Sequence, residues 1–165
     1  MSEHPAAWTS DLRGRLDELL DEYRTTLLDS LDGLTEDEAR ARLVPSKTTL
    51  LGLVKHVTYV EGVWFDQAVR SRTYDEIGIA TTPDESFTLR TSDTIASVQA
   101  GYRSRCESSR RTMEELEMDA TVEGRGPRPV WALQLQVLRE LAHHAGHADI
   151  LREQVMARRT DPGRT

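Results

Sequence analysis

Leu50-Leu-Gly-Leu-Val-Lys-His-Val-Thr-Tyr-Val-Glu-Gly-Val-Trp-Phe65 is the most apolar stretch of the sequence. Apolar residues recur in it every three or four positions, as they do along the buried face of an α-helix. Ser46 or Thr48 can cap the start of this helix. Pro45, just before them, lacks an amide hydrogen and therefore separates it from any preceding helix. We expect a largely buried helix that continues to about Arg70.

Three further stretches of the sequence repeat apolar residues at the same helical spacing. They cover about residues 9–32, 91–116 and 130–157, with candidate caps for the middle one at residues 91–93. A short helix at residues 35–43 begins with Thr35 and Glu38, which form a Thr-x-x-Glu capping box. Strand-type alternation is limited to a few residues around Thr121 and Val122. The sequence therefore predicts an all-α fold, a four-helix bundle.

The sequence favours one domain, at residues 1–158, followed by a disordered tail at residues 159–165. No internal repeat or Gly/Ser-rich linker divides the chain. Residues 71–90 lack helical periodicity and form a predicted loop of about 20 residues, a length that compact domains usually reserve for function. We expect this loop to connect the second and third helices and to cover a cleft.

Composition and charge exclude several classes of function. A net charge of −7 argues against a surface that binds nucleic acid. No apolar run approaches the roughly 20 residues that span a bilayer, and residues 1–8 lack the pattern of a secretory signal. The single cysteine, Cys106, allows no intramolecular disulfide, and its helix-period apolar position favours core packing over a nucleophilic role. We therefore expect a cytoplasmic protein with neither nucleic acid nor membrane as a partner.

A carboxylate and several histidines interrupt the apolar stripe of the last helix. At roughly 100° per residue, Glu140, His144 and His147 share one side of the helix with leucine and valine residues, whereas His143 falls at the edge of that side. His56 likewise faces inward on the helix that begins near Leu50. Polar groups in an apolar stripe are unfavourable unless they are paired or bound to a cation.

These residues are candidate ligands for a metal ion. A glutamate and a histidine four apart on one helix, Glu140 and His144, plus His56 from a facing helix, supply nitrogen and oxygen donors with positions left open for water or substrate. Zinc, nickel or iron would suit this set. In the alternative interpretation, Glu140 pairs with an arginine and the histidines are hydrogen-bonded core or rim residues. The spacing of His143 and His147 is not His-Glu-x-x-His, which disfavours a zincin-type protease.

The chain resembles the DinB-like superfamily at residues 44–56, at Glu61, at Trp64-Phe65, at Glu140 and at residues 144–153. Within it, the chain is most similar to the actinobacterial branch related to mycothiol-dependent maleylpyruvate isomerases. The resemblance implies a four-helix bundle with a long crossover, a divalent metal between the second and fourth helices, zinc first among the candidates, and a homodimer.

Carried over by position, the superfamily's ligands fall on residues that the spacing also selects. His56 matches the ligand on the second helix, and Glu140 and His144 match the pair on the last helix. Many relatives carry histidine at position 140, whereas the mycothiol-dependent branch carries glutamate. His147 stands where relatives often carry glutamine, so its role as an extra ligand or as a support for a ligand stays open.

Two functions follow from this resemblance. The first is a metal-dependent enzyme that activates a low-molecular-weight thiol, mycothiol in the first instance, for S-transfer to a small electrophile or for its isomerisation. A cation with an open position lowers the pKa of a bound thiol and so generates the attacking thiolate. The second is a non-catalytic, stress-associated homodimer that acts as a binding or scaffold protein. The intact set of three ligands and the long crossover favour the enzyme.

Overall fold

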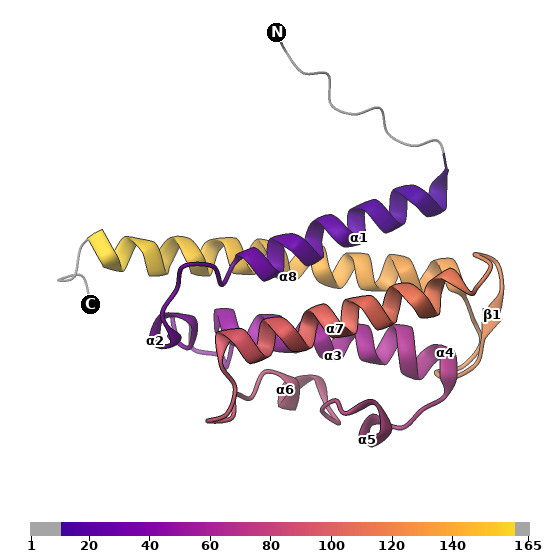
Figure 1. Cartoon of the computed structure of the whole chain (residues 1–165), viewed down its shortest axis with the longest axis horizontal. Coiled ribbons are helices and arrows are strands. Elements are labelled where there is room, and N and C mark those ends of the chain that lie inside the picture. Colours follow the sequence, from indigo (N-terminus) through magenta and orange to yellow (C-terminus); the bar gives the residue numbers. More distant parts are fainter. Residues whose placement is uncertain (1–10, 161–165) are drawn as a thin grey trace, which may run out of the picture.

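The computed structural model describes residues 11–160, and four long helices account for most of them (Figure 1). They are α1 (Leu12–Asp29), α3 (Leu50–Gly62), α7 (Ile95–Glu114) and α8 (Val130–Thr160). A π-helical segment, η1 (Val63–Gln67), and a short helix, α4 (Ala68–Arg70), extend α3 without a break. Helix α1 packs against α8, and α3 packs against both α7 and α8. The predicted all-α fold is confirmed.

Short elements connect the long helices. They are α2 (Glu36–Ala39), α5 (Tyr74–Ile77), α6 (Pro83–Ser86) and the strands β1 (Thr121–Val122) and β2 (Arg128–Pro129). The two strands pair in antiparallel fashion and form a hairpin between α7 and α8. The strand-like residues expected near position 121 are therefore a local hairpin, and the fold around them remains helical.

The N-terminal caps of α3 and α7 each lie one residue after the last of the predicted candidates. Thr49, rather than Ser46 or Thr48, caps α3 by accepting a hydrogen bond from a backbone amide of the first turn. Thr94, rather than a residue in 91–93, caps α7 in the same way. Several hydroxyl or carboxyl residues precede each helix, and only the one with extended backbone geometry next to the first turn can act as the cap. Sequence spacing alone does not distinguish them.

Helix α8 is longer than predicted. It continues to Thr160, three residues past the predicted end, and near that end Arg159 forms an ion pair with Glu38 at 2.6 Å. The rest of the predicted tail, residues 161–165, and the predicted start of α1 at Thr9 lie outside the described residues. None of the helices in the described range combines the length and apolarity needed to cross a membrane.

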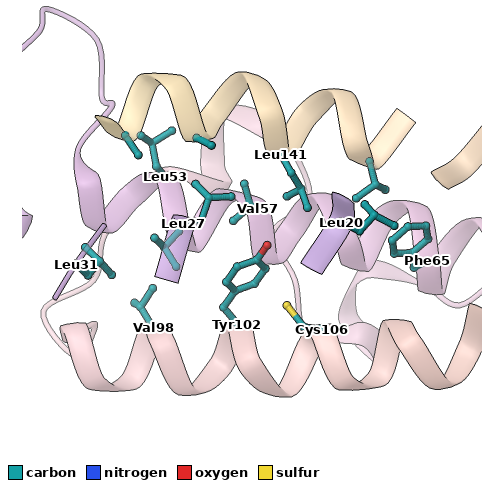
Figure 2. Close-up of a cluster of buried hydrophobic side chains, with 14 of the residues drawn as sticks. Leu20, Leu27, Leu31, Leu53, Val57, Phe65, Val98, Tyr102, Cys106 and Leu141 are labelled. Atoms are coloured by element: carbon teal, nitrogen blue, oxygen red, sulfur yellow. The ribbon is translucent and has the colours of Figure 1, made fainter. Parts of the chain in front are cut away.

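The core of the bundle is a continuous apolar cluster formed by all four long helices. Figure 2 shows Leu27, Val57, Tyr102 and Leu141 from these helices pointing into a shared interior. Each of the four is completely buried. Cys106 lies in the same cluster, and burial raises the pKa of its thiol well above the ordinary value. The sequence-based interpretation of Cys106 as a core residue agrees with this position.

A charged pair lies inside this apolar core. Arg24 of α1 donates two hydrogen bonds to Glu61 of α3, Nε to Oε1 at 2.8 Å and Nη2 to Oε2 at 3.0 Å. Both side chains are buried, and the hydroxyl of Tyr102 lies 3.4 Å from the same carboxylate. A buried charge is tolerated only when it is paired. The Arg24–Glu61 pair therefore connects α1 and α3 through the interior of the bundle.

The crossover from α3 to α7 contains more structure than the sequence suggested. Residues 71–90, predicted as a loop, include the one-turn helices α5 and α6, capped by the hydroxyls of Thr73 and Thr82. Four residues are too few to display a helical period, which is why the sequence did not reveal them. Helix α6 packs against α3. The crossover runs along the lower edge of the bundle in Figure 1.

Arg24→Ala tests the importance of the buried pair, because it leaves the Glu61 carboxylate buried without its partner. Removing one member of such a pair commonly costs about 3–5 kcal/mol of stability. We expect the free energy of unfolding, measured by urea denaturation, to fall by this amount. The control is Arg111→Ala, which removes an exposed pair with Glu107 and should cost less than about 1 kcal/mol. Equal losses from the two variants would contradict the assignment.

Candidate metal centre

The structure brings His56, Glu140 and His144 together between α3 and α8. One ligand atom from each residue, an imidazole nitrogen or a carboxylate oxygen, lies within 4.8 Å of the corresponding atoms of the other two. Across residues 11–160, no other group of three or more His, Cys, Asp or Glu side chains converges in this way. Residues more than 80 positions apart in the sequence thus form one cluster.

The cluster is buried on one side and open on the other. His56 and His144 are only 6% and 8% exposed, whereas the side chain of Glu140 is 23% exposed. Solvent therefore reaches the cluster from the Glu140 side. His56 and His144 enclose the cluster, and Glu140 lies at its opening. This arrangement leaves room for a small molecule to approach an ion held between the three side chains.

The imidazoles of His56 and His144 are neutral at physiological pH. Burial, and in addition the proximity of His144, lowers the pKa of His56 to about 3. Burial is also the main cause that lowers the pKa of His144 to about 4, and Glu140 opposes this shift. A neutral ring keeps a lone pair on one nitrogen, and this lone pair is what a metal ion requires.

The two oxygens of Glu140 have different neighbours. Oε1 accepts hydrogen bonds from Gln136 Nε2 at 3.0 Å and from Arg139 Nη2 at 2.9 Å. Oε2 lies 3.7 Å from Nε2 of His144. The sequence-based alternative, in which Glu140 pairs with an arginine, is therefore realised at one oxygen, while the other oxygen faces the cluster.

The crossover closes the cluster behind His56. Nδ1 of His56 lies 2.7 Å from the hydroxyl of Ser86, the last residue of α6. The ring of Phe87 stacks on the His56 ring with centroids 4.0 Å apart and planes 12° apart. Sequence reasoning assigned the crossover a covering role but did not identify Ser86 or Phe87. Neither lies in a periodic stretch that could have singled it out.

His143 and His147 both lie on the exposed side of α8, contrary to the helical-wheel expectation for His147. Their ring centroids are 4.3 Å apart, and that of His147 is 5.7 Å from the centroid of His144. The wheel centred the buried stripe near Glu140. In the structure, the stripe centres near Leu141 and Ala148, roughly 80–100° further round the helix. This rotation turns His147 toward solvent.

The donor set fits a divalent cation. Two imidazole nitrogens and a carboxylate oxygen are ligands that zinc accepts, with a fourth position left for water or substrate. Nδ1 of His144 is buried and has no hydrogen-bond partner among the described residues. Buried polar atoms without a partner are rare in folded proteins and call for an explanation such as a missing ion or water. The unpaired nitrogen is therefore consistent with a site that is completed by a bound group.

A groove of about 690 Å³ opens between α3, α7 and the crossover, and none of the three cluster residues lines it. Its wall includes Ser86 and Tyr59, and both residues also contact the ring of His56. The predicted cleft next to the crossover is therefore present. Its volume falls in the range of small-molecule sites, roughly 300–1,000 Å³.

The model of one protein family, Mycothiol-S-transferase, matches residues 15–157 of the chain. The chain belongs to the mycothiol S-transferase family. The matched residues run from α1 almost to the end of α8 and include all three residues of the cluster. This membership confirms the resemblance to the mycothiol-related branch of the DinB-like superfamily. A search of curated proteins gave no match for this mycothiol S-transferase family member.

The neutral, buried histidines make the stability of the metal-free protein depend on pH. An unfolded histidine takes up a proton below about pH 6.5. The folded rings of His56 and His144 stay neutral to much lower pH because their pKa values are lowered. Protons therefore favour the unfolded state, and stability is lost as the pH falls below about 6.5. Each ring contributes up to about 1.4 kcal/mol per pH unit in this window.

Urea denaturation of chelator-treated protein at about pH 7 and about pH 5.5 measures this dependence. We expect the free energy of unfolding to be about 2 kcal/mol lower at the acidic pH. His144→Leu should roughly halve the difference, whereas His143→Ala, at an exposed position on the same helix, should leave it unchanged. Equal stability of the wild-type protein at the two pH values would contradict the neutral state of the buried rings.

Proposed function

We propose that this protein is a metal-dependent enzyme that activates a low-molecular-weight thiol, mycothiol in the first instance, for transfer to a small electrophile or for its isomerisation. The observation that carries the proposal is the convergence of His56, Glu140 and His144 in a member of the mycothiol S-transferase family. The partial exposure of Glu140 supports it, because a thiol and an electrophile need access to the site from solvent.

In this proposal His56, Glu140 and His144 hold one divalent cation, with zinc first and nickel or iron as alternatives. Imidazole and carboxylate ligands suit all three metals. When bound, the cation lowers the pKa of a thiol that coordinates it. Two neutral imidazoles and one carboxylate balance only one of the two charges of such an ion. An anionic thiolate is therefore favoured at the position that the protein leaves open.

The other residues around the cluster prepare it for this role. Gln136 and Arg139 hold one oxygen of Glu140 and so direct the other toward the cluster. Phe87 packs on His56 and excludes water from the buried side of the site. His143 and His147 lie exposed beside His144, with ring centroids 5.4 Å and 5.7 Å from its ring. A supporting role of His147 toward a ligand stays part of the proposal.

A cytoplasmic homodimer completes the proposal. Trp131 and Leu135 are exposed apolar residues one turn apart on α8, and a second copy of the chain could cover them. The same surface supports the alternative function, a non-catalytic, stress-associated scaffold that depends on dimerisation. The two functions differ in their need for the cluster, since a scaffold does not require three converging ligands.

Metal binding by single variants tests the ligand set. We expect wild-type protein, purified without an affinity tag, to bind about one divalent ion per chain, and His56→Ala to reduce occupancy strongly because only two ligands remain. Glu140→Ala and His144→Ala should behave alike, whereas the matched control His143→Ala should retain the ion. Circular dichroism should show that the metal-free protein stays helical, because the core is formed without the site. Full occupancy in all three cluster variants would refute the ligand assignment.

Thiol transfer is tested by following adduct formation between mycothiol and a panel of small electrophiles. Activity should disappear after chelation, return with zinc, and fall by at least about tenfold in Glu140→Gln, which keeps the shape of the side chain but removes its charge. Glutathione and free cysteine serve as comparison thiols. If the zinc-loaded wild-type protein reacts no faster than the chelated protein with every thiol and electrophile tested, the scaffold function is favoured instead.

A further inference from the structure

We propose that Ser86 is a positioning residue that fixes the tautomer of His56, so that Nδ1 carries the hydrogen and Nε2 offers the lone pair to a metal ion. The inference extends the proposed function to the crossover, and its metal-binding part rests on that function. A neutral imidazole has one donor nitrogen and one acceptor nitrogen, and the partner of one nitrogen determines the state of the other.

The hydroxyl of Ser86 has a single hydrogen to donate, and α6 directs it away from His56. Ser86 Oγ donates to the carbonyl oxygen of Pro83 at 2.5 Å. That carbonyl is left free by the backbone of α6, because the amide of Phe87, which would reach it in a continuing α-helix, bonds to Asp84 at 3.3 Å instead. A carbonyl oxygen can only accept, so the direction of this hydrogen bond is fixed.

Toward His56, the same hydroxyl can therefore act only as an acceptor. Nδ1 of His56 lies 2.7 Å from Ser86 Oγ and must be the nitrogen that carries the hydrogen. Nε2 is then unprotonated, and it is the ring nitrogen left for the cluster with Glu140 and His144. With the opposite tautomer, Nε2 would carry a hydrogen and could not bind a cation.

The burial of Ser86 and the attachment of the crossover to α3 keep the Ser86–His56 hydrogen bond in place. Ser86 is 2% exposed, so water does not compete for its hydroxyl. Lys55, which precedes His56 on α3, donates to the carbonyl of Thr88 at 2.7 Å and pairs with Asp93 at 2.8 Å. These contacts hold the chain against α3 just after Ser86 in the sequence. The stacked ring of Phe87 limits rotation of the His56 ring, which keeps Nδ1 facing the hydroxyl.

Long-range ¹H–¹⁵N correlation spectra of the histidine side chains report the tautomer directly, in metal-free protein at neutral pH. We expect His56 of the wild-type protein to be in the Nδ1–H form. In Ser86→Ala, the Nδ1–H group loses its acceptor, and the two tautomers should become mixed. Ser109→Ala is the matched control, because Ser109 is equally buried and its hydroxyl has no hydrogen-bond partner among the described residues. Ser86→Thr retains a hydroxyl and should restore the wild-type spectrum.

Zinc affinity, measured by competition with a chromophoric chelator, tests the consequence. Residues that orient a metal-binding histidine typically change affinity by about 10–100-fold. We expect Ser86→Ala to weaken zinc binding at least about tenfold and Ser109→Ala to leave it unchanged. An Nε2–H form of His56 in the wild-type protein would overturn the proposal, as would wild-type tautomer and affinity in Ser86→Ala. Absence of zinc binding by the wild-type protein would instead refute the proposed function, whatever tautomer the spectra show.

Discussion

The constraint on which the site depends is the burial of two neutral imidazoles, His56 and His144, at the contact between α3 and α8. Their desolvation is unfavourable for the charged form and keeps both rings unprotonated at physiological pH. The structure compensates for this burial only in part. His56 shares a hydrogen bond with Ser86, but Nδ1 of His144 is buried and has no hydrogen-bond partner among residues 11–160.

Helix α3 connects this site to the rest of the bundle. Glu61 pairs with Arg24 inside the core and so connects α3 to α1, and Tyr102 of α7 contacts the same carboxylate. Lys55 fixes the crossover to the outer side of the helix. His56 lies between these two anchors, so its position is set on both sides. The protein itself therefore sets the shape of the site.

Sequence reasoning succeeded where a periodic pattern extended over many residues. The four long helices follow from their apolar spacing, and the convergence of His56, Glu140 and His144 follows from placing polar residues on inward faces. It failed where the decisive geometry is local. The cap of α3 at Thr49 depends on backbone angles, and the side chains of Ser86 and Phe87 reach His56 from a one-turn helix. The outward position of His147 depends on how far α8 rotates about its axis.

Absorption spectroscopy of the cobalt-substituted protein tests the central claim most directly, because it reports ligand geometry and thiolate binding in one sample. Wild-type protein loaded with cobalt(II) should show the visible bands of a low-coordinate site. Addition of mycothiol should produce a sulfur-to-cobalt charge-transfer band in the near ultraviolet. His144→Ala should lack both signals. A cobalt-loaded wild-type spectrum that mycothiol leaves unchanged would contradict the account, since the metal would then not bind the thiol that it is proposed to activate.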